Sequence, residues 1–216
     1  MKRFTSERGH RLCPLLDSRN GQLRAALEPS FMGGLMSLID KALAAVTPQP
    51  DDETRKAATE KARAASQAGD WLSLVLDHHD SIRAAFASGR TAKTTVERNA
   101  ARDALAVVLN GHALAEELVL YPALGQAGEK MHAAHAYLEQ TTTKAQMAEL
   151  ENIAPSKTAW LEKWAHIEGA VLTHMFEEES DWFLTLKAKG HHQIRLASRY
   201  AKEFERYAGA PQSRAA

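Results

Sequence analysis

Apolar residues recur at helical spacing in four long stretches of the chain. In the first stretch, Leu72, Val75, Ile82 and Phe86 fall on one side of a helix. Asp70, just before it, is a residue type that caps helix N-termini. Glycine and proline separate the stretches from one another. The pattern predicts four long helices, over residues 71–88, 94–121, 129–153 and 156–189.

Short links join the four predicted helices, and the chain has no alternating apolar and polar pattern typical of strands. Short links place successive helices antiparallel and side by side. We therefore expect an all-α protein built on an up-down-up-down four-helix bundle. A fifth helix is expected over residues 191–207, either across the end of the bundle or along the fourth helix.

The pattern divides the chain into three parts. Residues 1–66 are an N-terminal extension, partly helical and partly disordered, residues 67–209 are the bundle with its C-terminal helix, and residues 210–216 are a disordered tail. The extension contains an apolar cluster between Phe31 and Ile39, which is unfavourable in water. Three roles stay open for this extension: packing on the bundle, forming a homodimer, or remaining mobile.

Charge and cysteine content exclude several classes of protein. The 216 residues include 27 basic and 27 acidic side chains, so no net charge attracts nucleic acid. The single cysteine, Cys13, rules out an internal disulfide framework and fits a reducing compartment. The sequence has no signal-peptide core and no long uninterrupted apolar run. We expect a cytoplasmic protein that binds neither nucleic acid nor membrane.

Two of the predicted helices carry a histidine and a glutamate four residues apart on their apolar side. The pairs are His112 with Glu116 and His174 with Glu178. Residues at this spacing are about one helical turn apart, so both members of a pair face the same direction. Burying such groups is unfavourable unless they pair with polar groups or hold a metal ion. The occurrence of the same pair on two helices favours a metal ion.

The other two predicted helices also carry histidines. The first has His78 and His79, of which His79 is favoured because it shares the apolar face. The third has His132 and His135, with Glu139 four residues after the second of them. In a four-helix bundle, imidazoles and carboxylates at similar heights converge on the axis, where they suit iron or manganese.

Other polar and aromatic residues have simpler interpretations. We assign no site to four further histidines: His10, His166, His191 and His192. The tryptophans are expected to pack in the core: Trp71, Trp160, Trp164 and Trp182. Glu117 and Glu179, which follow the paired glutamates, are expected to be solvated. Tyr121 either points toward the pocket or marks a helix end. Without a metal ion, the paired groups would form a buried hydrogen-bonded network.

The motifs follow one another in the order histidine, His-x-x-x-Glu, histidine, His-x-x-x-Glu. They are Asp77-His-His-Asp, His112-x-x-x-Glu116-Glu-x-x-Leu-Tyr-Pro122, Gly128-Glu-Lys-Met-His132 and His174-Met-Phe-Glu-Glu-Glu179. With this order, the region from Asp70 to Gly209 resembles the hemerythrin-like proteins of the HHE cation-binding family. The resemblance implies a four-helix bundle that holds a di-iron centre, two non-haem iron ions with an oxo or hydroxo bridge. It implies these ligands: His79, His112, Glu116, His132, His174 and Glu178, with Glu139 as a further candidate.

The chain departs from the oxygen-carrying hemerythrins at two places. Those carriers have a histidine pair four residues apart on the third helix, whereas here Ala136 stands four residues after His132. They end with an aspartate five residues after the fourth-helix histidine, where this chain has Glu179. Both differences favour a site richer in carboxylate over a dedicated oxygen carrier. Whether His135 or Glu177 also ligates is left open.

We therefore expect a non-haem di-iron protein that binds or reacts with a small ligand, in oxygen, iron or redox sensing or in a stress response. The ligand is dioxygen, peroxide or nitric oxide, and peroxide disproportionation is one candidate activity. The first alternative is a metal-free helical regulatory or scaffold module. The second is a ferritin-like di-iron oxidase, which ranks lower because that class needs two Glu-x-x-His motifs. The bundle has one, Glu129-Lys-Met-His132.

Overall fold

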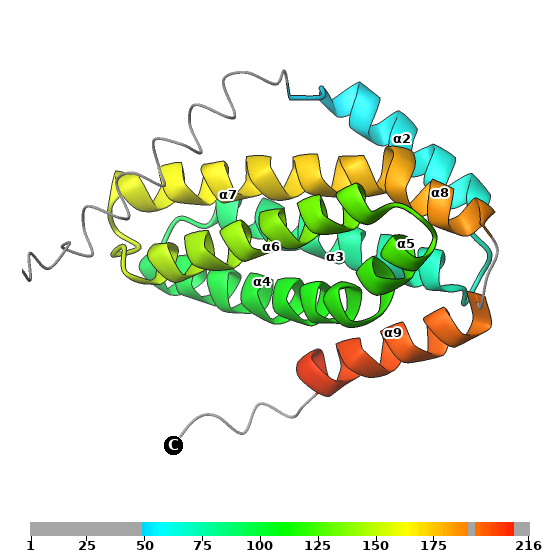
Figure 1. The fold of residues 1–216 in the computed structure, drawn as a ribbon. Coiled ribbons are helices and arrows are strands. Elements are labelled where there is room, and N and C mark those ends of the chain that lie inside the picture. The colour runs from blue at the N-terminus through cyan, green and yellow to red at the C-terminus, as the bar shows by residue number, and fades with distance from the viewer. Residues whose placement is uncertain (1–48, 190–192, 210–216) are drawn as a thin grey trace, which may run out of the picture. The chain divides into compact units, whose positions relative to one another are not determined.

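The computed structural model describes residues 49–189 and 193–209, and every regular element in these ranges is a helix. Four long helices form the bundle: α3 (Trp71–Thr91), α4 (Thr95–Ala115), α6 (Lys130–Glu151) and α7 (Thr158–Glu177). Both α3 and α6 pack against α4 and α7, so the four helices surround one core (Figure 1). The prediction of an all-α helical bundle is confirmed.

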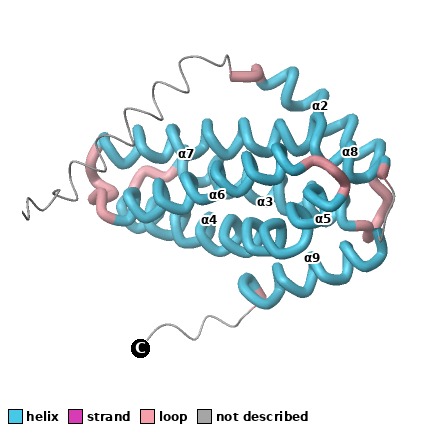
Figure 2. The backbone as a smooth tube through the Cα atoms, in the orientation of Figure 1, coloured by secondary structure: helices cyan, strands magenta, loops and turns pink. Residues whose placement is uncertain are grey.

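Short loops join the helices (Figure 2), and side-chain caps start the first two bundle helices, α3 and α4. Asp70 caps α3, because its carboxylate accepts the N–H of Ser73 at 2.7 Å. Thr94 caps α4 in a reciprocal arrangement with Glu97, whose carboxylate accepts the N–H of Thr94 at 3.0 Å. These bonds satisfy N–H groups that have no partner inside the first helical turn.

We use the term rod for a continuous run of helical elements, so the four rods of the bundle begin with α3, α4, α6 and α7. The second and fourth rods change their hydrogen-bond pattern part-way along. α4 continues as the π-helix η1 (Glu116–Leu120) and then as α5 (Tyr121–Gln126). α7 continues as the π-helix η2 (Glu178–Trp182) and then as α8 (Phe183–Ala188). Single-turn π segments are rare and are frequent at functional sites. Nothing in the apolar spacing predicted either of them.

Pro122 lies inside the second rod instead of ending it. The helix was predicted to run to about Tyr121 and to stop soon after, at Pro122 and Gly125. α5 carries it past the proline, and it ends at Gln126. A proline has no N–H, so carbonyl groups in the preceding turn lose a donor. The carbonyl of Glu117 accepts a hydrogen bond from the Tyr137 hydroxyl at 2.6 Å. The carbonyl of Leu118 accepts one from the Arg199 guanidinium at 3.3 Å.

Two further helices pack on the outside of the bundle. α2 (Asp52–Ala65) packs against α3, α7 and η2, whereas α9 (Gln193–Ala208) packs against α4, α3 and η1. The C-terminal helix therefore lies on the first two rods, and the predicted position across the bundle end or along the fourth helix is wrong. Gly111 of α4 permits this close approach, because a Cβ there would meet Phe204 at 3.3 Å.

Two apolar clusters fill the interior. Leu76 of α3 belongs to one cluster, and Ile82 and Phe86 of the same helix belong to the other. His79 stands between these residues in α3 and is fully buried. Polar side chains therefore enter the core part-way along the bundle. The tryptophans pack in the two clusters as predicted: Trp71 and Trp182 in the first, Trp160 and Trp164 in the second.

One stretch of the described residues, Thr95–Gln126, is long and apolar enough to cross a membrane by length and composition alone. Of its most apolar window, 56% is buried inside the bundle. Core helices of water-soluble bundles meet the same criteria, so this stretch is weak evidence for a membrane. The stretch is interrupted by Glu116 and Glu117, so it is not an uninterrupted apolar run.

Some sequence predictions fall on residues outside the described ranges. They concern the partly helical and disordered segments within residues 1–48 and the tail, residues 210–216, together with these single residues: His10, Cys13, His191 and His192. The described part of the N-terminal extension is α2 with its cap, Asp51, which accepts the N–H of Thr54 at 2.8 Å. The proposed boundaries between the three parts of the chain stay a prediction.

Candidate metal centre

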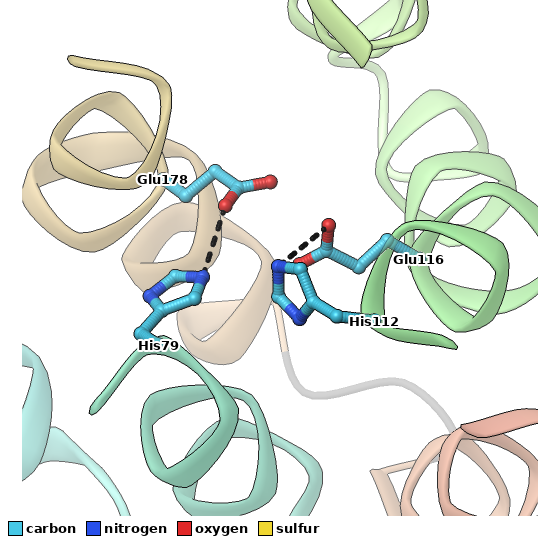
Figure 3. Close-up of side chains that lie close together, drawn as sticks. All are labelled: His79, His112, Glu116 and Glu178. Carbon is cyan, nitrogen blue, oxygen red and sulfur yellow. Dashed lines mark ion pairs between the residues drawn. The ribbon is translucent and has the colours of Figure 1, made fainter. Parts of the chain in front are cut away.

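Four buried side chains from three rods of the bundle converge on one point (Figure 3). His79 comes from α3, His112 from α4, Glu116 from the start of η1, and Glu178 from the start of η2. One ligand atom from each of them lies within 4.8 Å of the others. His79 Nε2 is 3.3 Å from Glu178 Oε2, and His112 Nε2 is 3.2 Å from Glu116 Oε2. Both predicted His-x-x-x-Glu glutamates therefore face the same pocket.

A fifth side chain, His174 of α7, extends this cluster. Its Nε2 lies 3.3 Å from Glu178 Oε1 and 3.0 Å from the hydroxyl of Tyr121. That hydroxyl is also 3.0 Å from Glu116 Oε2 and 3.0 Å from Glu178 Oε1. With one proton to donate, Tyr121 can bond to only one of the two carboxylates at a time. We use the term buried cluster for these five residues: His79, His112, Glu116, His174 and Glu178.

The π segments explain why Tyr121 reaches the buried cluster. Glu116 is the first residue of η1, and the N–H of Tyr121 bonds to its carbonyl, five residues earlier. In an α-helix, residues five apart are separated by about 1.4 turns and face different directions. The wider π turn brings them back to one side. Of the two interpretations of Tyr121, the structure supports the one in which it points toward the pocket.

Each histidine of the buried cluster has its second ring nitrogen fixed by a hydrogen bond. His79 Nδ1 bonds to Glu179 at 2.7 Å, and His174 Nδ1 bonds to Glu139 at 2.8 Å. His112 Nδ1 bonds to the Tyr200 hydroxyl at 3.0 Å. Metal-binding histidines almost always have such a partner, which selects the tautomer and holds the ring in place. In all three rings the other nitrogen, Nε2, therefore points into the cluster.

Two carboxylates predicted from the sequence have other positions than expected. Glu179 was expected to be solvated, but it is fully buried and also pairs with Arg83 at 2.6 Å and with Thr59. The reason is that η2 turns it toward His79. Glu139 lies behind His174 and contacts its Nδ1, so it does not join the atoms at the centre of the cluster.

The neighbouring His78 does not enter the buried cluster. Its ring stacks on Phe204 and its Nδ1 is 2.9 Å from the Tyr200 hydroxyl. Burial lowers the pKa of His78 to about 4, and the nearby His79 adds to that effect. A neutral His78 accepts the Tyr200 proton, which leaves the Tyr200 oxygen free to accept the Nδ1–H of His112. The sequence-based preference for His79 over His78 agrees with this arrangement.

The third rod, α6, contributes an amide to the centre instead of an imidazole. Gln140 is buried, and its Nε2 donates to Glu116 Oε2 at 2.7 Å and to the Tyr121 hydroxyl at 2.5 Å. His132 is partly exposed, stacks on Trp182 and lies 3.3 Å from a carboxylate oxygen of Glu129. The structure therefore does not bring His132 to the buried cluster, nor the Glu-x-x-His motif to which it belongs.

Burial disfavours charge on every side chain of the buried cluster. It raises the pKa of Glu116 well above its usual range, and the nearby Glu178 adds to the effect. It lowers the pKa of His112 well below the usual value. For His79, burial lowers the pKa, but hydrogen bonds to Glu178 and Glu179 outweigh it and raise the pKa to about 9. A cation that enters the cluster must therefore displace protons.

Glu116 Oε1 and, beside the cluster, Gln140 Oε1 are buried without a hydrogen-bond partner among the described residues. His79 Nε2 and Glu178 Oε2 have only each other, 3.3 Å apart. Leaving such atoms unsatisfied is unfavourable, and in native proteins it often indicates a missing ion or ligand. Imidazole nitrogen and carboxylate oxygen are donors that suit iron or manganese. The residues present therefore fit a metal ion.

A family of cation-binding domains matches the bundle. The model of the hemerythrin HHE cation binding domain matches residues 70–186, more than half of the chain. The chain belongs to this family. The family predicted from the four motifs is thereby confirmed, and the buried cluster is compatible with the cation binding for which the family is named. Comparisons with curated proteins and with solved structures found no match.

Proposed function

We propose that this hemerythrin-like protein holds non-haem iron in its buried cluster and binds or reacts with a small ligand there. The ligand is dioxygen, peroxide or nitric oxide, and the role is in oxygen, iron or redox sensing or in a stress response. One observation carries the proposal. Three imidazoles, each held by a hydrogen bond at Nδ1, present Nε2 to two buried carboxylates.

The proposed ligands are the five residues of the buried cluster. Two iron ions are proposed, because Glu178 contacts both His79 and His174, Glu116 contacts His112, and a carboxylate would be able to bridge two metal ions. The two positions are unequal in donors. On one side of the cluster, the imidazole ligands would be His79 and His112. On the other side, the imidazole ligand would be His174, with the Tyr121 hydroxyl and the Gln140 amide beside it.

A small cavity beside the cluster supports a small ligand. Its volume is about 20 Å³, and its lining includes His112, Gln140 and His174 together with apolar residues such as Val171 and Met175. A space of this size holds about one water-sized molecule. An organic substrate would not fit in this cavity, whereas a diatomic molecule or peroxide would require little rearrangement.

Iron in such a site supplies an open coordination position and electrons. The protein's own contribution is hydrogen bonding and the exclusion of water. The Tyr121 hydroxyl is within hydrogen-bond distance of both carboxylates and donates its proton to one of them, and burial together with the two carboxylates raises its pKa well above the ordinary value. The Gln140 amide fixes the position of Glu116 Oε2.

Metal analysis and an optical spectrum test this proposal directly. After anaerobic reconstitution with iron(II), we expect about two iron ions per chain, as in other di-iron carboxylate bundles. We expect His112→Ala to lose most of this iron. His132→Ala is the matched control and should keep it, because His132 lies outside the buried cluster. Less than about one iron per chain in the unaltered protein would contradict a di-iron centre.

A metal-free helical regulatory module is the second candidate function. Ion pairs within the cluster support it, because His79 contacts Glu178 and Glu179 and could be held by them without metal. This function predicts that His112→Ala and His174→Ala have the same thermal stability with and without iron. A response to iron that these variants abolish would exclude it.

A further inference from the structure

A second group of metal-binding side chains lies on the surface beside the buried cluster. His135 and Glu139 of α6 meet Glu177 at the end of α7, and one ligand atom of each lies within 4.8 Å of the others. His135 Nε2 is 3.2 Å from Glu139 Oε1 and 3.6 Å from Glu177 Oε2. We propose that these three residues bind a divalent cation and form the site through which iron reaches the buried cluster. The entry role rests on the proposed iron-binding function.

We use the term surface trio for His135, Glu139 and Glu177. These three side chains do not satisfy one another's charges and hydrogen bonds. Two carboxylates face a single imidazole, and like charges at such distances repel. Glu177 Oε2 is buried, yet it has no hydrogen bond to any residue that the structure describes. One imidazole nitrogen and two carboxylate oxygens suit iron(II) or manganese(II). A divalent cation would neutralise both carboxylates and satisfy the free oxygen.

The surroundings favour cations. A groove of about 470 Å³ borders the trio, and its lining includes His132, His135, Glu177 and Asp181 but no lysine or arginine. Clefts lined by charge of one sign raise the local concentration of ions of the opposite sign. His132, which the sequence placed among the ligands of the centre, thus lies next to the surface trio instead.

Glu139 joins the surface trio to the buried cluster. Its Oε1 faces His135, and its Oε2 is 2.8 Å from His174 Nδ1. His174 in turn presents Nε2 to Glu178, the residue directly after Glu177. The side chains of the buried cluster are at most 9% exposed, so iron needs a path of donors from solvent. The trio is a group of donors that contacts the cluster and is partly open to solvent.

The experiment compares the unaltered protein with the double variant His135→Ala/Glu177→Gln, which changes no residue of the buried cluster. Glu149→Gln, on the exposed face of α6 where it pairs with Lys163, is the matched control for loss of a carboxylate. Circular dichroism and thermal unfolding establish that all three proteins fold. Manganese(II) binding is followed by electron paramagnetic resonance, and iron(II) uptake is followed anaerobically over time.

We expect the double variant to lose one weakly held manganese ion that the unaltered protein and Glu149→Gln both bind. We expect its iron uptake to slow by about tenfold, the lower end of the effect of a charged cleft on association rates. Its final iron content and optical spectrum should equal those of the unaltered protein. Unchanged manganese binding would overturn the surface site, and unchanged uptake kinetics would overturn its role in entry.

Two further outcomes separate this inference from the proposed function. If the double variant loses iron from the final product, the three residues are ligands of the centre itself and a separate surface site is overturned. If the unaltered protein takes up no iron but loses a manganese ion on His135→Ala/Glu177→Gln substitution, the proposed function fails while the surface cation site stands.

Discussion

At the scale of single residues, the hydrogen bonds behind the histidines determine what the buried cluster can bind. Glu179, Tyr200 and Glu139 each hold one Nδ1 atom, so every Nε2 atom is directed inward. A carboxylate partner also makes the imidazole a more basic ligand than a hydroxyl partner does. His79 and His174, which Glu179 and Glu139 hold, should therefore depend more on their partners than His112 does on Tyr200.

Replacing Glu179 with glutamine tests this dependence. The amide oxygen still accepts the Nδ1–H of His79, but the negative charge is lost. We expect Glu179→Gln to weaken iron binding by about tenfold, the lower end of the effect of such substitutions. Competition with a chelator of known affinity measures it. Glu117→Gln is the matched control, because Glu117 also follows a cluster glutamate but pairs with Lys144 at the surface. Equal affinity of the two variants would contradict the assigned role of Glu179.

The sequence identified the proposed metal-binding side chains of the buried cluster better than the residues that form hydrogen bonds to them. The four-residue spacing is a direct consequence of helix geometry, so His112 with Glu116 and His174 with Glu178 could be identified from it. Gln140 was missed, although it lies one turn after the buried Ala136 on the inward face of α6. A search for histidine and carboxylate alone passes over an amide at that place. Glu179 was missed because its direction depends on a π turn.

At the scale of elements, the helices followed from apolar spacing and caps, whereas their irregularities did not. The π segments start at Glu116 and Glu178, where the His-x-x-x-Glu spacing still fits an α-helix. The extra residue changes the direction of side chains later in each rod, including that of Tyr121. Gly89 was another misleading signal, since the sequence indicated that it ends the first helix. α3 continues to Thr91, and Gly89 instead makes room for a side chain of α7.

Because Gly89 makes room for a side chain of α7, we expect Gly89→Ala to have the opposite of its usual effect on helix stability. In a helix, alanine is normally more stable than glycine by about 0.5–1 kcal/mol. A Cβ at Gly89 would overlap the Trp164 ring, so the ring would have to move within a packed core. We expect Gly89→Ala to destabilise the protein by about 1–3 kcal/mol, the usual cost of overpacking.

Gly169→Ala in α7 is the control for Gly89→Ala. A Cβ at Gly169 would meet nothing within 4 Å, so the ordinary helix preference should raise stability there. Urea unfolding of both variants gives the two free energies of unfolding. If both substitutions stabilise the protein, Trp164 does not pack on Gly89 as described.

The contribution of Asp70, at the start of α3, to the stability of the protein should depend on pH. Asp70 accepts the Ser73 N–H and pairs with Lys187 of α8 at 2.5 Å. Burial raises the pKa of Asp70, but the bonds from Lys187, Ser73 and Gln67 outweigh it and hold the pKa below its ordinary value of 3.8. The ionised carboxylate therefore stabilises the folded state above pH 3.8, and this contribution is lost as pH falls through the lower folded-state pKa.

Two substitutions of Asp70 separate the cap from the ion pair. Asp70→Asn keeps an acceptor for the cap and removes the charge, whereas Asp70→Ala removes both and should cost about 1 kcal/mol more from the lost cap. We expect the difference in unfolding free energy between the unaltered protein and Asp70→Asn to shrink between pH 7 and pH 3. A difference that is the same at both values would show that the charge of Asp70 contributes nothing.

At the scale of the whole molecule, the buried cluster links the rods that hold it. Its residues come from α3, from the rod of α4 and η1, and from the rod of α7 and η2. The bundle itself was predictable, because each long apolar stripe has to be covered by another. The position of α9 was not. Its apolar residues Leu196, Tyr200 and Phe204 show that one face is buried but not against which helices, and its close contact with α4 depends on the absence of a side chain at Gly111.

Iron bound by three of the four rods should stabilise the fold as one unit. A ligand that binds only the folded state adds about 2.7 kcal/mol at roughly 100 times its dissociation constant. For a chain of this length, that corresponds to a rise in Tm of about 5–10 °C. We expect this rise when iron(II) is added anaerobically, and its reversal when a chelator removes the iron. Differential scanning calorimetry measures both.

Two variants determine whether the rise in Tm comes from the buried cluster. His112→Ala removes a donor that lies between two rods, so iron should no longer raise its Tm. His132→Ala should respond as the unaltered protein does, because His132 stacks on Trp182 outside the cluster. An equal rise in both variants would mean that iron stabilises the bundle from somewhere else. In that case the imidazoles at the core are packing residues, and the network of Tyr121 and the two carboxylates is complete without a cation.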